Sequence, residues 1–479
     1  MQLRESLSMS RGKELLKNTA VVAIGKVCTK FLSFFLLPLY TAVLSTEDYG
    51  IVDLLGTYTL LLLPLIVFQI EEALFRFTID VREKEEEKRK IVSTVIVFCA
   101  VQATIFLCIF LIVQTFIPST YKWFLMTNVL LNIFSGPLVQ LTRGLGDNYT
   151  YAFVSFLNAF VTIVLNIVLI LGVGMGAEGL FIAAYTASAV VICYVVWKKK
   201  VYKMLRIRWF DRKCLKEMLA YSLPLVPNTL SWWVIGASDK SVVNFFLGVS
   251  QNGILSVSQK FSTLFTTFYS IFNLAWVENA SVHKDDMDYE TYYSQIIETT
   301  FRVLSCACLG IIAVVAIVFP WLINEKFGES YYQIPIYMLS SLLHSSIGIF
   351  SAVYIAYKRT AEVAKTSVLA AFINLTVNVL LIKHIGLYAA SISSVIAYGT
   401  LLVIRYFDIQ KFVKIRMKKS VMLSVVFVMI IDFSTYYIRN AWVSVLNLVL
   451  VAVYAVFMNR KIVIELLNIV KKKMKRGTV

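Results

Sequence analysis

Long runs of hydrophobic residues, separated by short polar segments, recur from one end of the chain to the other. A helix needs about 20 apolar residues to cross the hydrocarbon of a bilayer, and these runs reach or approach that length. The pattern predicts an all-α polytopic membrane protein with about fourteen transmembrane helices. Their expected ranges are 17–43, 51–77, 91–117, 121–142, 149–172, 178–197, 219–247, 252–281, 294–322, 331–357, 362–382, 387–406, 420–437 and 441–458. The first residues lack the order of a cleavable signal peptide, so we expect the first run to remain a membrane helix.

Lysine and arginine gather in alternate connecting segments of this pattern, as expected when short cytoplasmic loops hold the basic excess. With the N-terminus inside, the inner segments are 4–17, 82–90, 198–216, 411–419 and the C-terminal KKKMKR. The outer loops hold only Lys122, Lys326, Lys383 and Arg439. Both termini are therefore predicted to be cytoplasmic. The loop at 283–290 departs from this pattern, because it is mostly acidic although it is assigned to the inside.

Composition agrees with the pattern of hydrophobic runs. The 479 residues are 58% hydrophobic and 16% charged, with a mean hydropathy of +0.74, whereas about a quarter of a soluble domain is charged. The net charge of +17 follows from the loop asymmetry and favours contact with anionic lipids. No nucleic-acid partner is expected. Seven cysteines without CxxC spacing and three scattered histidines predict neither a zinc site nor a cofactor.

An internal repeat is visible at a spacing of about 200 residues. LSTEDYGIVDL from Leu44 matches LGVSQNGILSV from Leu247, so that Gly50 and Gly253 are 253 − 50 = 203 residues apart. Two further matches follow in the same order: NIVLI from 166 with NVLLI from 378, and GLFIAA from 179 with GLYAAS from 386. Three ordered matches indicate a duplicated unit.

Each repeat holds six predicted helices, so both copies enter the membrane from the same side. Parallel repeats of this kind form two lobes around a central cleft, as in transporters. We therefore expect an N-terminal lobe at 1–208, a C-terminal lobe at 209–410, and two additional helices with a basic cytoplasmic tail at 411–479.

Charged residues lie inside several predicted spans, where each central Lys or Arg costs about 3 kcal/mol if it faces lipid. Six such side chains would cost about 18 kcal/mol, more than the net stability of a typical domain. Most must face water, a partner or a ligand. The basic ones, which we predict to bind substrate, are Lys26, Lys30, Arg76, Lys240, Lys260 and Arg302. The acidic ones, candidates for ion coupling, are Glu71, Glu72, Asp239 and Glu278.

Lys26 and Lys30 lie deepest, about 13 and 20 Å from the start of the first predicted helix. Both fall on one polar helical face. The alternative is that they form structural ion pairs with the acidic residues of other spans. Lys240 has Asp239 beside it as an alternative ion partner. Arg76 and Arg302 are close enough to the inner surface to extend into water.

Positive charge exceeds negative charge among these buried positions. Such a cavity favours an anionic passenger such as a phosphate or pyrophosphate, because opposite charge offsets the hydration that the passenger loses. Separately, Asp286 and Asp288 spell DxD, a pair with which many glycosyltransferases hold a metal-bound nucleotide. A membrane glycosyltransferase or polymerase is therefore an alternative, although a solvated acidic loop explains the same residues.

Several segments together resemble Wzx-type polysaccharide flippases, of the superfamily that also contains MATE exporters and the lipid II flippase. They are LSTEDYGIVDL, EEALFRF (71–77), RGLGDNYTYA, SDKSVVNFFLG and GLYAASISS. The resemblance implies translocation of undecaprenyl-pyrophosphate-linked oligosaccharide to the outer face by alternating access, without catalysis. It also implies an Arg at the end of the second helix, which Arg76 matches. Possible partners are a polymerase, glycosyltransferases, and a proton or sodium gradient. A MATE-like antiporter of small molecules is the alternative within transport.

Overall fold

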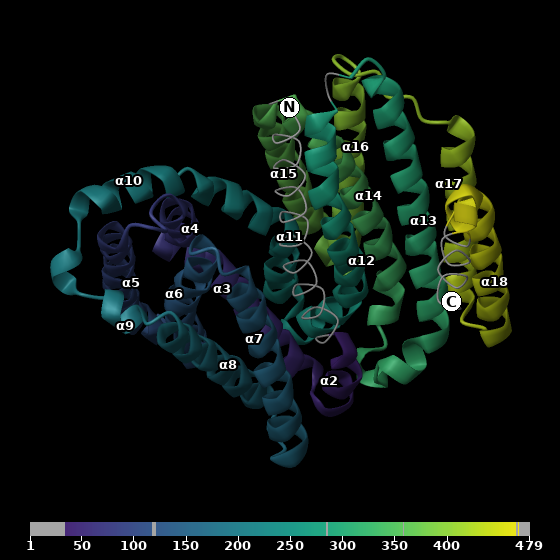
Figure 1. Ribbon diagram of the computed structural model, residues 1–479. Helices are drawn as coiled ribbons and strands as arrows, with labels where there is room; N and C mark the ends of the chain where they lie inside the picture. Colours follow the sequence, from purple (N-terminus) through teal and green to yellow (C-terminus); the bar gives the residue numbers. More distant parts are fainter. Residues whose placement is uncertain (1–33, 117–120, 284–285, 358, 466–467, 469–479) are drawn as a thin grey trace, which may run out of the picture. The chain divides into compact units, whose positions relative to one another are not determined.

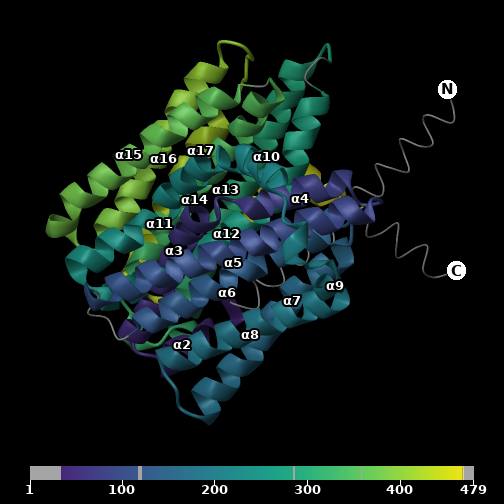
Figure 2. The same cartoon turned by 90° about the vertical axis from the view of Figure 1, so that its left-hand side faces the viewer.

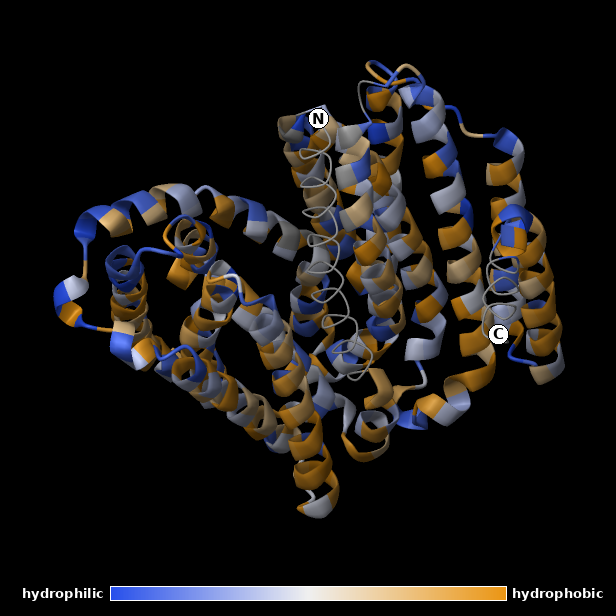
Figure 3. Cartoon of the chain, viewed as in Figure 1, coloured by the Kyte–Doolittle hydropathy of each residue, from blue (hydrophilic) through white to orange (hydrophobic). Residues whose placement is uncertain are grey.

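The computed structural model describes residues 34–116, 121–283, 286–357, 359–465 and 468, and these form helices joined by turns (Figure 1). Eleven helices of this part are long and apolar enough to cross a membrane. Figure 3 shows hydrophobic residues along most of their length. The predicted all-α membrane architecture is confirmed. The count of fourteen stays a prediction, because most of the span at 17–43 lies outside the described residues.

The chain packs as two compact units, which divide between Ser256 and Val257. The boundaries predicted at 208 and 410 were drawn from the internal repeat, whereas the two compact units are defined by contacts within the structure. The predicted boundaries therefore stay a prediction. The first unit contains the helices α2 (Leu37–Val43), α3 (Thr46–Val67), α4 (Ile70–Asp80), α5 (Glu85–Val113), η1 (Gln114–Phe116), α6 (Lys122–Gly144), α7 (Asn148–Ile167), η2 (Val168–Gly172), α8 (Ala177–Lys198), α9 (Val201–Met204), η3 (Ile207–Trp209), α10 (Arg212–Ser222), α11 (Leu225–Leu247) and the start of α12 (Val249–Val282).

Helices α6, α7 and α8 run alongside one another in the first unit, and α4 packs on α6 (Figure 2). Ile70, Leu74, Val95 and Ile133 are almost fully buried in the core that these helices share with α5. Outside the spans, Asp147 caps α7 and pairs with Lys199 after α8. Burial raises the pKa of the Asp147 carboxyl, but hydrogen bonds from Lys199 and Thr150 outweigh it and bring the pKa to about 2. These contacts fasten the ends of two neighbouring helices to each other.

The continuous helix predicted over 51–77 is wrong. The chain ends α3 at Val67 and begins α4 at Ile70, with Phe68 and Gln69 between them at φ of 52° and 55°. Left-handed residues end a helix because they turn the next carbonyls off its axis. Neither residue is a glycine, so the hydrophobic pattern gave no sign of the break.

The second unit repeats the packing order of the first. Besides most of α12 it contains α13 (Tyr289–Leu322), η4 (Glu325–Phe327), α14 (Ser330–Ala356), α15 (Thr360–Ile385), α16 (Tyr388–Ile409), α17 (Lys419–Ile438) and α18 (Ala441–Met458). Helix α15 runs along α16 and α14 packs on α16, as α7 runs along α8 and α6 packs on α8. Asn166 and Asn378, which the repeat aligns, are both buried. The equivalent pairings support the duplication read from the sequence.

Helices α17 and α18, the two beyond the repeat, pack on α13 and on each other. The hydroxyl of Tyr331 donates to the carbonyl of Tyr436 at 2.9 Å, and the hydroxyl of Tyr436 donates to the carbonyl of Tyr331 at 3.0 Å. Their rings stack at 4.1 Å. This reciprocal contact attaches the end of α17 to the start of α14.

The motif that revealed the repeat lies where α3 and α12 cross in the first unit. Ser45 accepts a hydrogen bond from the backbone of Asp48 at 2.9 Å and so starts α3. A Cβ added to Gly50 would lie 2.0 Å from the Val249 carbonyl oxygen, and one added to Gly253 would lie 2.0 Å from that of Thr46. Only glycine at both positions allows the backbones to approach this closely.

The close approach of α3 and α12 can be tested with two glycine substitutions on α3. Gly50→Ala should destabilise the protein by about 1–3 kcal/mol through overpacking. Gly56→Ala, also on α3, has open space around the added carbon, so it should be neutral or slightly stabilising because alanine favours helix. Melting temperatures of the purified proteins in one detergent measure both. Equal melting temperatures for the two variants would contradict the close approach.

Candidate functional site

The predicted site residues fall in different parts of the described structure. Lys26 and Lys30 lie outside the described residues. Glu278 lies on α12, where its side chain is not described. Of the rest, Glu71, Glu72, Arg76, Asp239 and Lys240 belong to the first unit, whereas Lys260 and Arg302 belong to the second. Their assignment to substrate or ions therefore stays a prediction, and each unit is described by itself.

Residues at the start of α4 differ in their surroundings. Arg76 is exposed and pairs with Asp80 one turn later at 2.7 Å. Glu72 accepts a hydrogen bond from Gln140 at 3.1 Å. One carboxylate oxygen of Glu71 is buried and accepts no hydrogen bond from the residues that the structure describes.

Lys240 on α11 has a partner that the sequence analysis did not consider. Its ammonium lies 2.7 Å from the Asp53 carboxylate on α3, which also accepts a hydrogen bond from Ser256 at 2.6 Å. Asp239, the neighbour proposed from sequence, is itself buried, and Lys260 is half-buried. The sequence did contain a sign that Asp53 could contact a neighbouring helix. Asp53 belongs to the repeated motif and lies seven residues after Thr46, which places both on the same helical face.

That face of α3 forms a polar seam against α11 and α12, which we define as Thr46, Gly50, Asp53 and Thr57. Thr46 shares a hydrogen bond with Ser250 at 2.5 Å, the Gly50 carbonyl accepts from Asn252 at 2.9 Å, and the Thr57 carbonyl accepts from Trp233 at 2.9 Å. The seam is thus polar at each step, and one ion pair lies within it.

A polar pocket of about 420 Å³ lies among α2, α6, α7 and α8 of the first unit. Its polar lining is uncharged, and its apolar lining comes from valine, leucine, isoleucine and alanine; the polar residues are Tyr40, Ser135, Ser155, Asn158 and Thr162. Ser155 and Thr162 donate to backbone carbonyls one turn back at 3.0 and 2.7 Å, so their oxygens are left as acceptors. Such a lining suits hydroxyl groups better than ions.

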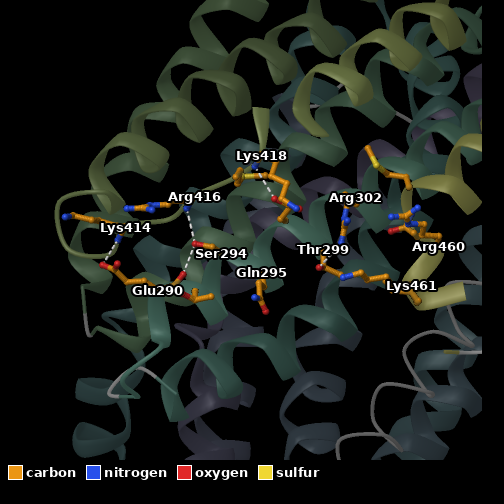
Figure 4. Close-up of a pocket in the computed structure, with 16 residues that line it drawn as sticks. Glu290, Ser294, Gln295, Thr299, Arg302, Lys414, Arg416, Lys418, Arg460 and Lys461 are labelled. Atoms are coloured by element: carbon orange, nitrogen blue, oxygen red, sulfur yellow. Dashed lines mark hydrogen bonds between the residues drawn. The ribbon is translucent and has the colours of Figure 1, made fainter. Parts of the chain in front are cut away.

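A basic pocket of about 980 Å³ lies in the second unit, between the start of α13, the segment before α17 and the residues after α18 (Figure 4). We define it by its six basic and two acidic residues: Arg302, Lys414, Arg416, Lys418, Arg460, Lys461, Glu290 and Glu298. Arg302 donates to Thr299 at 3.2 Å, while its Nε is buried and has no hydrogen-bond partner among the described residues. Arg302 forms no ion pair with Glu298, which lies four residues earlier on the same helix.

The DxD residues do not converge. Asp286 pairs with His283 at 2.7 Å, and Asp288 occupies the position before α13. In the described part of the chain no group of three His, Cys, Asp or Glu side chains is placed to hold a metal ion.

Comparison with known sequences assigns the family. A profile of polysaccharide biosynthesis proteins matches residues 15–277, more than half of the 479. The chain belongs to the polysaccharide biosynthesis protein family. No curated protein matches it closely enough by sequence to count as a relative.

Solved structures place this family member in the fold of the MOP superfamily. The lipid II flippase MurJ, in an inward closed conformation, aligns with a TM-score of 0.67 and 14% identity over 94% of this chain and 100% of MurJ. An inward-facing multidrug resistance MATE family transporter aligns with a TM-score of 0.64 and 15% identity over 79% and 93%. A MOP superfamily transporter from Pyrococcus furiosus gives 0.52 and 14% over 82% and 96%. The resemblance read from the sequence is confirmed for family and fold.

Two buried charged residues of this family member were missed by the sequence analysis. Arg405 on α16 is 2% exposed and donates to Ser351 at 2.5 Å and Ser367 at 2.9 Å. Asp432 on α17 is fully buried and accepts from Asn447 on α18 at 2.6 Å. Each of these charges interrupts an apolar run of the sequence, and that interruption could have marked it as a buried charge. The interruption did not reveal its uncharged partners.

The Lys240 to Asp53 pair predicts a double-mutant result. Lys240→Met should cost about 1.5–3 kcal/mol because it removes a charge-assisted hydrogen bond to the half-buried Asp53 carboxylate. Adding Asp53→Asn should restore much of the loss, since the amide keeps an acceptor for Ser256. Thermal unfolding of the wild type, both single variants and the double variant gives the coupling. Losses that simply add would show that the pair contributes nothing to stability.

Proposed function

We propose that the chain is a flippase that moves undecaprenyl-pyrophosphate-linked oligosaccharide from the cytoplasmic to the outer face of the bacterial inner membrane, for a surface polysaccharide. It works by alternating access rather than by catalysis. The family match supports the pathway, and the transporter fold of its structural neighbours supports the mechanism.

The observation that carries the proposal is the polar pocket of the first unit. A sugar presents many hydroxyl groups and no charge, and it is bound by amides, hydroxyls and aromatic rings that replace its water hydrogen bonds. The pocket offers the ring of Tyr40 and the side-chain amide of Asn158, which makes no hydrogen bond within the described structure. An exporter of organic cations would need a carboxylate, and none lines the described pocket.

The anionic end of the passenger needs cations rather than hydroxyls. In the proposed function Lys26, Lys30 and the other basic residues of the predicted spans, Arg76, Lys240, Lys260 and Arg302, bind the pyrophosphate, while the polyprenyl chain stays in lipid. Glu71, Glu72, Asp239 and Glu278 are the carboxylates proposed to couple transport to a proton or sodium gradient. Both termini lie in the cytoplasm in this scheme.

Reconstitution in vesicles tests the activity directly. With the protein present, a lipid-linked oligosaccharide loaded on one leaflet should become accessible to a glycosidase or lectin on the other side, and protein-free vesicles should show no such exposure. If the vesicles instead release a fluorescent organic cation and expose no sugar, the chain is a MATE-like antiporter. Formation of new glycosidic bonds that is lost on Asp286→Asn with Asp288→Asn would favour the glycosyltransferase.

The polar pocket has a matched pair of substitutions. Thr162→Val removes a hydroxyl that lines the pocket, whereas Thr104→Val removes an exposed hydroxyl on α5 that donates to its own helix in the same way, at 2.9 Å. We expect Thr162→Val combined with Asn158→Leu to slow flipping about tenfold or more, since each lost hydrogen bond is worth about 1 kcal/mol. Thr104→Val should leave the rate unchanged. Equal rates for all variants would remove the pocket from the transport path.

A further inference from the structure

The basic pocket of the second unit is built so that its acidic residues do not neutralise its basic ones. Glu290 accepts a hydrogen bond from the backbone N–H of Lys414 at 3.1 Å, and Glu298 accepts from the backbone N–H of Lys418 at 3.1 Å. None of the six basic side chains forms an ion pair in the described part of the chain. The side-chain charges are therefore available to a ligand.

Backbone spacing explains why the segment before α17 lies where it does. The N–H groups of Lys414, Arg416 and Lys418 donate to side chains at positions 290, 294 and 298 of α13. Two residues of an extended strand advance about 6.6 Å, and four residues of a helix advance about 6 Å. Every second N–H of the extended segment therefore lies beside every fourth side chain of α13. Alternate side chains of an extended segment share a face. Ile415 points into the core, at 2% exposed, and the three basic side chains project together on the opposite face.

The pocket lies at one end of three candidate spans. Helix α17 begins at Lys419 and α18 ends at Met458, both at the rim. Helix α13 has 34 residues and is about 51 Å long, about 21 Å more than the hydrocarbon is thick. Its first 14 residues, which end at Arg302, make up this excess. The basic residues thus lie at the level of lipid headgroups, on the side that the loop charges predict to be cytoplasmic.

Charge decides what kind of headgroup fits. Six cations and two carboxylates give the lining a formal charge of 6 − 2 = +4. In Figure 4, Lys414 and Arg416 lie at one end of the pocket, Arg460 and Lys461 at the other, and Arg302 between them. A single phosphodiester would leave most of this charge uncompensated, and a zwitterionic headgroup would add an ammonium of its own.

We propose that the basic pocket binds a membrane lipid whose headgroup carries two phosphates. Arg416 and Lys418 hold one end of the headgroup, Arg460 and Lys461 hold the other, and Arg302 lies between them. Two sources share this chemistry: a polyprenyl diphosphate and a phospholipid with two phosphodiesters. The proposal does not rest on the proposed function, because a phospholipid of this kind is a ligand whatever the protein transports.

Binding to the purified full-length protein in neutral detergent tests the site. The probes are undecaprenyl diphosphate, cardiolipin, phosphatidylglycerol, phosphatidylcholine and inorganic pyrophosphate, with affinity measured by native mass spectrometry or tryptophan fluorescence. The two-phosphate lipids, or one of them, should bind at least tenfold more tightly than phosphatidylglycerol. Preference for undecaprenyl diphosphate alone identifies the passenger as the source, and preference for cardiolipin alone identifies a resident lipid.

Variants with the same change in net charge distinguish binding in the pocket from nonspecific attraction between the basic protein and anionic lipid. Arg302→Gln, Arg416→Gln and Lys418→Gln combined should weaken two-phosphate lipid binding at least tenfold. The matched control combines Lys326→Gln, Lys365→Gln and Lys383→Gln, away from the pocket, and should change it less than twofold. If the triple pocket variant unfolds, Arg460→Gln with Lys461→Gln, both exposed after α18, replaces it.

Three results would overturn the proposal. Equal weakening by the pocket and control variants would show only nonspecific attraction. Phosphatidylglycerol binding as tightly as the two-phosphate lipids would remove the requirement for two phosphates. Inorganic pyrophosphate binding as tightly as the lipids would show that no lipid is required. If the wild-type protein binds the two-phosphate lipids but exposes no lipid-linked oligosaccharide in vesicles, only the proposed function fails.

Discussion

The hydrocarbon of a bilayer contains no water to satisfy a polar group, so each N–H, carbonyl and charge placed there must find a partner within the protein. The all-helical described structure follows from that constraint, because a helix pairs nearly all of its own backbone. The remaining problem is the polar side chains. They occur in sets that complete one another, such as the Asp53, Lys240 and Ser256 contacts in the first unit and the Asp432 to Asn447 bond in the second.

Polar contacts of this kind also set where helices approach one another. On α3, Thr46, Gly50, Asp53 and Thr57 lie on one face, so a single helix can offer a hydroxyl, a bare backbone and a carboxylate to its neighbours in turn. The glycine at the centre brings the backbones together, and the flanking side chains then reach their partners. Such a seam combines close packing with hydrogen bonds whose strength depends on the absence of water.

The two pockets differ in the chemistry of their linings. The polar pocket of the first unit offers uncharged hydrogen-bonding groups, and the basic pocket of the second unit offers cations at headgroup level. The latter exists because the segment at 414–418 lies along α13 with its backbone hydrogen-bonded to acidic and hydroxyl side chains. The end of α18 and the residues that follow it, 458–462, lie outside the repeat and line another side of the pocket.

The sequence by itself determined the class of the protein, most of the spans and the duplication, because hydrophobic length and repeated motifs are local properties of the chain. It also identified Lys240 and Arg302 as charges that needed an explanation. Only the tertiary structure decided their surroundings: Asp53 pairs with Lys240 from a distant part of the chain, and Glu298 turns to the backbone of Lys418 instead of to Arg302. The break at Phe68 and Gln69 likewise had no local signal. The partner of a buried charge and the lining of a pocket depend on which faces of separate helices are in contact. Those contacts are determined by the packing of the helices.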